Sequence, residues 1–136
     1  AFGDDADNPY LPHNYVATTC AFTGTHDNDT FAGWWLGATP RERAFAAAYL
    51  GCADVDAHWA AIRAVSQSVA RLALFPLQDV LGLGSEHRMN TPGAEQCWTW
   101  RFSWDMVGPH AATGLAALSA ACGRAPLSRL CMLGPD

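Results

Sequence analysis

Residues 18–23 (TTCAFT), followed by residues 24–30 (GTHDNDT), form the stretch of sequence that decides the fold. The first run is rich in β-branched residues and stops at Gly24, so it predicts a short strand. The polar cluster then lies at the carboxyl end of this strand, which is where α/β folds place their ligands. The sequence therefore predicts an α/β fold with a polar site at a strand end.

Helices and a second strand are predicted after this site. Residues 39–42 (TPRE) form a capping box with Pro at the first helical position, and they open an alanine-rich helix that ends near Gly51. A second helix is predicted from Asp56, because apolar residues recur at three- and four-residue spacing. The residues on that face are Trp59, Ile62, Val65 or Ser66, and Val69. Residues 71–77 (RLALFPL) predict a buried parallel strand that ends at Pro76, which completes a β-α-β unit.

The remaining segments are predicted from composition and spacing. Residues 1–19 are dense in Asp, Asn and Pro and predict a loop, and a second loop covers residues 82–97. In residues 98–104 (WTWRFSW) the aromatic residues recur at period two, which would place four rings on one side of an extended segment. A last helix is expected after Pro109 and ends at Gly123. The residues expected to face inward on it are Leu115, Leu118 and Cys122.

Composition and charge exclude several functional classes. The chain has 136 residues, half of them hydrophobic, and we expect residues 1–136 to form a single segment with a real core. Its net charge is −5 and it has no basic run, which argues against nucleic acid as a partner. No apolar stretch approaches the roughly 20 residues of a membrane span, and no signal peptide is recognisable. We therefore expect a cytoplasmic protein that does not bind membranes.

The cluster at residues 26–29 (HDND) permits more than one interpretation. A metal site is disfavoured, because a calcium loop from Asp27 would need Gly at its sixth and Glu at its twelfth position, and no second His is spaced for zinc. The five dispersed cysteines suggest reduced packing residues. Asp29 or Thr30 could cap a following helix, with Asp27 forming an Asx-turn. Carboxylates, amides and six Trp residues also suit carbohydrate binding, so both interpretations stay open.

Five motifs follow one another along the chain. They are residues 8–15 (NPYLPHNY), residues 24–30 (GTHDNDT) with 33–35 (GWW), residues 76–84 (PLQDVLGLG), residues 88–93 (RMNTPG) and residues 98–101 (WTWR). In this order they resemble the 4-alpha-glucanotransferase family, which includes amylomaltase and disproportionating enzyme. The resemblance extends from Ala1 to about Arg101.

The resemblance implies an enzyme that transfers α-1,4-glucan chains from a maltodextrin to a glucose or maltose acceptor with retention, without a cofactor or a metal. Such chemistry uses a carboxylate nucleophile and an acid/base about 5–5.5 Å apart, and in this family both precede the segment present here. The third acidic residue of the family, which stabilises the transition state, corresponds to Asp27, and His26 would bind the same sugar. Asn90 and Asp4, or Asp5 beside it, match further sugar contacts.

The same resemblance implies a (β/α)₈ barrel. A complete barrel takes roughly 250 residues, so we expect about the last two strands with their helices, an incomplete barrel as an isolated chain. Open strand edges would favour self-association, and the isolated chain is expected to be inactive. The alternative is a non-catalytic α-glucan-binding or inactive structural fragment.

Overall fold

The computed structural model describes residues 5–95 and 97–125 of the chain. Its strands are β1 (Cys20–Phe22) and β2 (Leu72–Leu74). Its α-helices are α1 (Phe31–Gly37), α2 (Pro40–Leu50), α3 (Ala57–Gln67), α4 (Leu77–Val80) and α5 (Pro109–Ala121). Short 3₁₀ turns are η1 (Pro12–Asn14), η2 (Asp54–Asp56), η3 (Ser85–His87) and η4 (Trp104–Met106).

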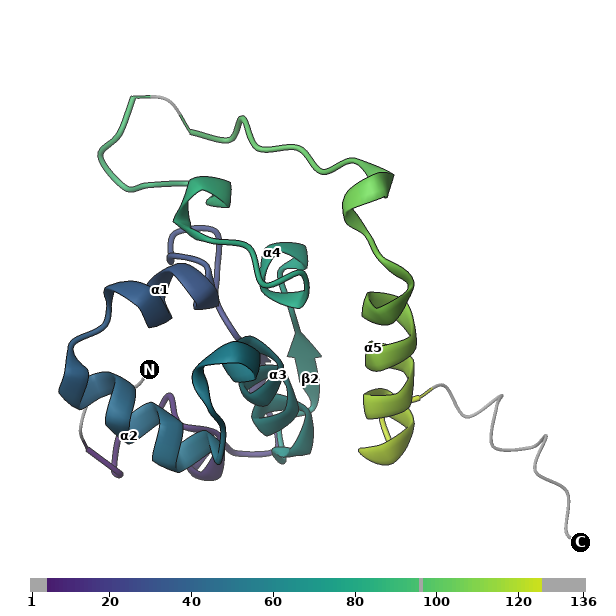
Figure 1. Ribbon diagram of the computed structural model, residues 1–136. Helices are drawn as coiled ribbons and strands as arrows, with labels where there is room; N and C mark the ends of the chain where they lie inside the picture. Colours follow the sequence, from purple (N-terminus) through teal and green to yellow (C-terminus); the bar gives the residue numbers. More distant parts are fainter. Residues whose placement is uncertain (1–4, 96, 126–136) are drawn as a thin grey trace, which may run out of the picture.

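The two strands pair in parallel, with Cys20 opposite Leu72 and Phe22 opposite Leu74. Helices α1, α2 and α3 connect them, so the predicted β-α-β unit is confirmed. Figure 1 shows α5 standing apart from α1 and α2, with β2 and α4 between them. Because the strands are parallel, their carboxyl ends point to the same edge, and the loops after β1 and β2 meet there.

Local sequence signals set the helix boundaries. The Thr39 hydroxyl accepts a hydrogen bond from the Glu42 amide, and the Glu42 carboxylate accepts one from the Thr39 amide, so the predicted capping box begins α2. Helix α2 ends at Leu50, and the C-cap residue Gly51 has a φ of +62°, in the left-handed region that glycine adopts without strain. Helix α3 ends at Gln67, earlier than predicted, because Ser68 is extended; Val69 is therefore exposed rather than buried.

The core lies between the helices and one face of the sheet. One cluster of buried residues joins α1, α2 and α3. Its members are Leu11, Phe31, Trp35, Ala46, Ala57 and Ala61. A second cluster packs Ala21 of β1 against Val65 of α3. The opposite face of the sheet is open: Phe22, Leu72 and Leu74 are 43%, 55% and 47% exposed. This is unusual for a parallel pair, since parallel sheets are normally covered on both faces.

The segment before α5 corrects one prediction. Residues 97–103 form neither helix nor strand, and Trp98 has a φ of +64°, which breaks the alternation that an extended segment requires. The rings therefore do not line one face as expected. Helix α5 follows as predicted, with Leu118 half-buried, and Gly123 (φ +66°) lies just beyond its end.

Candidate functional site

The polar loop 24–30 joins β1 to α1 at the carboxyl end of the parallel pair. Its last residue, Thr30, is the N-cap of α1, and its hydroxyl accepts a hydrogen bond from the Gly33 amide at 3.1 Å. The predicted capping role is therefore confirmed for Thr30. The cap uses only the end of the loop, and it leaves His26 and Asp27 exposed for other contacts.

Three of the predicted site residues lie together. The Asn90 side-chain amide donates to Asp27 Oδ1 at 2.5 Å, and His26 Nε2 lies 3.3 Å from the same oxygen. The side chains of His26 and Asp27 are 54% and 52% exposed, so both are accessible to a ligand. Arg88 adds a hydrogen bond from Nη2 to the Asp27 carbonyl at 3.1 Å. Residues that are 63 positions apart in sequence thus converge on one carboxylate.

The fourth predicted residue, Asp4, lies outside the described residues. Its neighbour Asp5 is exposed, and its carboxylate accepts a hydrogen bond from the Asp7 amide at 2.9 Å. Asp5 therefore stabilises a local turn of the chain. Which of the two acids contacts sugar stays a prediction.

An aromatic ring also borders the site. The Trp98 ring lies 5.0 Å from the His26 ring, tilted by 40°, and it is half exposed. The indole of Trp100 instead donates to His87 Nδ1 at 2.9 Å. The period-two pattern predicts one shared face for Trp98 and Trp100. The two rings instead have different partners, His26 for Trp98 and His87 for Trp100.

A layer of hydrogen bonds lies behind the loop. Asp79, only 1% exposed, accepts from the Thr23 hydroxyl at 2.5 Å and from the Phe31 amide at 2.7 Å. Burial raises the pKa of the Asp79 carboxyl above its usual value of 3.8, against the opposing effects of these two bonds and of His58. The motif at residues 76–84 contains Asp79 but gives no sign of these partners.

A second carboxylate in the same layer is Asp29. Its Oδ2 accepts from the Ser85 hydroxyl at 2.8 Å and lies 3.8 Å from Arg88 Nη1. These contacts hold the turn after β2 against the loop after β1. Within the described residues, no group of three or more His, Cys, Asp or Glu side chains is arranged to hold a metal ion.

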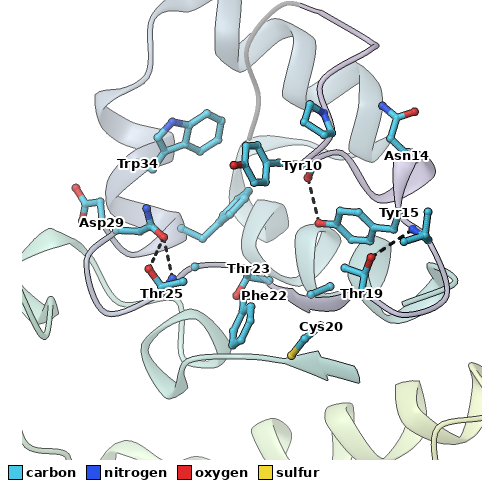
Figure 2. A pocket seen from close by; sticks show the side chains of 16 residues that line it. Tyr10, Asn14, Tyr15, Thr19, Cys20, Phe22, Thr23, Thr25, Asp29 and Trp34 are labelled. Atoms are coloured by element: carbon cyan, nitrogen blue, oxygen red, sulfur yellow. Dashed lines mark hydrogen bonds between the residues drawn. The ribbon is translucent and has the colours of Figure 1, made fainter. Parts of the chain in front are cut away.

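Two hollows adjoin the loop. A small one of about 160 Å³ lies between the loop and the segment after β2, and its lining includes His26, Asp79 and Arg88. A larger one of about 800 Å³ follows the side of β1 that carries no partner strand among the described residues. In Figure 2, Tyr10 and Tyr15 lie on one side of β1, whereas Phe22 and Cys20 point to the other.

The sequence pattern of the family described as 4-alpha-glucanotransferase matches residues 1–106. The chain belongs to the 4-alpha-glucanotransferase family. A 4-alpha-glucanotransferase of Thermus thermophilus is 45% identical over 133 residues, which cover 91% of this chain and 27% of the relative. The chloroplastic/amyloplastic 4-alpha-glucanotransferase of Arabidopsis thaliana is 48% identical over 103 residues, 74% of this chain and 18% of the relative.

A solved structure shares the fold. An amylomaltase from Streptococcus agalactiae in complex with acarbose superimposes with a TM-score of 0.87 and is 24% identical in sequence. The superposition covers 92% of this chain and 26% of the amylomaltase chain. The chain thus spans only 18% to 27% of the length of these three relatives. The family that the five motifs predicted is confirmed. In the part of the chain that the structure describes, no helix is long and apolar enough to cross a membrane.

Proposed function

We propose that this chain forms the part of a 4-alpha-glucanotransferase that stabilises the transition state of glucan transfer. The reaction moves an α-1,4-glucan chain from a maltodextrin donor to a glucose or maltose acceptor with retention of configuration. The sugar at the cleaved bond acquires oxocarbenium character, and a nearby carboxylate stabilises that developing positive charge. Asp27 is the carboxylate that takes this role.

The observation that carries the proposal is the environment of Asp27. It is half exposed at the carboxyl end of β1, and Asn90 and His26 both contact its Oδ1. A carboxylate that is held at one oxygen and open to solvent can accept strong hydrogen bonds from sugar hydroxyls. His26 and Asn90 carry further polar groups within reach of the same sugar.

We also propose that β1 and β2 are the last two strands of a (β/α)₈ barrel. The parallel pairing, the β-α-β connection and the likeness to amylomaltase support this assignment. The open apolar face formed by Phe22, Leu72 and Leu74 is suited to the packed interior of such a barrel. The nucleophile and the acid/base then come from other strands of the barrel.

A chimera tests the role of Asp27. In the Thermus thermophilus relative, this chain replaces the matching region, and production of longer and shorter glucans from maltotriose is measured. Asp27→Asn should lower kcat by at least about 100-fold, because it removes a charge that acts on the transition state, while the melting temperature changes little. Asp56→Asn, an exposed acid that forms no capping bond, is the matched control and should leave kcat within about twofold.

The isolated chain, incubated with maltotriose, should form no products. Disproportionation by the isolated chain would refute the assignment of the nucleophile and acid/base to other strands. A folded chimera in which Asp27→Asn retains near-normal turnover would refute the role of Asp27.

A further inference from the structure

One buried carboxylate is bonded to both ends of the loop that carries Asp27. Asp79 lies in α4, and it accepts from the Thr23 hydroxyl, which directly follows β1, and from the Phe31 amide, which begins α1. The segment between these two partners is the loop 24–30. Asp79 therefore closes a bridge across the base of the loop, and its partners lie 56 and 48 positions away in sequence.

The position of Asp79 is fixed by its own surroundings. Asp79 is 1% exposed. Its neighbour Gln78 is also buried, and the Gln78 side-chain amide donates to the His87 carbonyl at 3.2 Å. A short side chain held in this way has little freedom to follow a moving loop, so the loop ends are held to it.

Burial of this carboxylate is unfavourable for folding in itself. Desolvation raises the pKa of Asp79 although two hydrogen bonds to it act in the opposite direction. The two hydrogen bonds of Asp79 are therefore better explained by their effect on the position of the loop than by a large contribution to stability. A loop bearing a transition-state-stabilising group must be held within about 0.5 Å of its productive position.

We propose that Asp79 is a positioning residue for the glucan site: by bridging Thr23 and Phe31 it holds the 24–30 loop so that Asp27 stays against Asn90. The inference rests on the proposed function for its catalytic consequence. Asp79 is 1% exposed and its carboxylate is already bonded to Thr23 and Phe31, so it acts through the loop rather than directly on the sugar. Its effect on the loop can be measured without any activity.

The first test is amide hydrogen exchange on this chain. Asp79→Ala should speed exchange in residues 24–31 at least tenfold relative to α3, because both ends of the loop are released. Asp79→Asn keeps an oxygen for the Phe31 amide and an NH₂ group for the Thr23 hydroxyl, so it should restore protection. Asp54→Ala is the matched control: it removes an acid that accepts from the Trp35 indole at 3.0 Å, away from the loop ends.

A milder variant covers the case in which Asp79→Ala does not fold. Thr23→Val keeps the side-chain shape and removes one of the two bonds, so exchange should rise at the start of the loop more than in α3. The proposal would be overturned if both Asp79→Ala and Thr23→Val raised the exchange rates of the loop and of α3 by the same factor. It would also be overturned if Asp54→Ala raised exchange in the loop as much as Asp79→Ala does.

The second test uses the chimera with the Thermus thermophilus relative. Asp79→Ala should lower kcat at least tenfold with KM within about twofold, because a displaced Asp27 weakens the transition state more than ground-state binding. Asp79→Asn should recover most of kcat, which a loss of charge alone would not allow. Loop-specific exchange together with an unaffected kcat would retain the bridge and refute its catalytic part. If Asp27→Asn is itself neutral, the proposed function fails while the exchange result still decides the bridge.

Discussion

Gly33→Ala in α1 tests whether the site depends on close packing between α1 and η3. A Cβ at Gly33 would lie 2.2 Å from Ser85 Oγ and 2.6 Å from Asp29 Oδ1, whereas ordinary contact begins at 3.4 Å. Ser85 and Asp29 are bonded to each other, so neither can move away without weakening that bond. Overpacking costs about 2 kcal/mol, the weakened bond about 1 kcal/mol, and the helix propensity of Ala returns about 1 kcal/mol. We expect a net destabilisation of about 2 kcal/mol.

The same helix contains a matched control. Gly37 is the last residue of α1, and a Cβ there meets no atom within 4 Å, so Gly37→Ala should leave the free energy of unfolding unchanged or raise it by up to about 1 kcal/mol. Urea unfolding followed by circular dichroism measures both variants. Adding Ser85→Ala to Gly33→Ala removes the nearest atom and should recover part of the loss. Equal stability of the Gly33→Ala and Gly37→Ala variants would refute the packing argument.

Three further outcomes are expected. Thr39→Ala removes the capping box of α2 and should lower the free energy of unfolding by about 1 kcal/mol in urea titrations. Thr113→Ala makes the same chemical change at an exposed position, where the hydroxyl bonds only to carbonyls of its own helix, α5, and it should change the free energy of unfolding by less than about 0.5 kcal/mol. Burial raises the pKa of Asp79 in the folded chain, so the contribution of its protonated form to stability is present below pH 3.8 and is lost as pH rises through the raised pKa. Asp79→Asn does not titrate, so its stability relative to wild type should increase as pH rises above about 4. Parallel stability profiles of the two proteins against pH would contradict this. The open sheet face predicts concentration-dependent self-association of the isolated chain in sedimentation velocity, and a monomer at every concentration would argue against it.

The elements predicted correctly from sequence are those that local chemistry determines. The capping box at Thr39 needs only residues within one turn, and the strand after residue 18 needs only its own β-prone composition and the Gly24 that ends it. Both are visible in a single pass along the chain. The parallel pairing then follows, because helices between two strands allow a parallel crossover.

The errors occur where the backbone departs from a regular element. Trp98 was expected in an extended alternating run, but its amide donates to the Met89 carbonyl at 2.7 Å and its ring packs near His26. Val69 was expected on the buried face of α3, but the helix ends before it. Periodicity describes a regular element, and it carries no information once the backbone leaves that element.

The candidate site also contains features that the sequence predicts and one that it does not. The family resemblance predicts that His26, Asp27 and Asn90 bind sugar, but neither it nor the motif at residues 24–30 indicates the bridge through Asp79. Its carboxylate lies beside a Gln in a short apolar motif, and nothing in that motif specifies a partner 48 or 56 positions earlier. A buried acid of this kind can be recognised only when burial and hydrogen bonds are both known.

The contacts around the loop add little to folding stability but restrict the position of the loop. Ser85, Arg88 and Asn90 each reach the loop from the segment after β2, and most of these contacts are at least partly exposed to water. Exposed bonds of this kind contribute only about 1 kcal/mol or less each to folding. They nevertheless act on different atoms of the loop, so together they restrict its rotation and its translation. Since a misplacement of about 1 Å can cost a factor of roughly 100 in rate, we expect that removing these weak contacts lowers kcat of the chimera more than it lowers the free energy of unfolding.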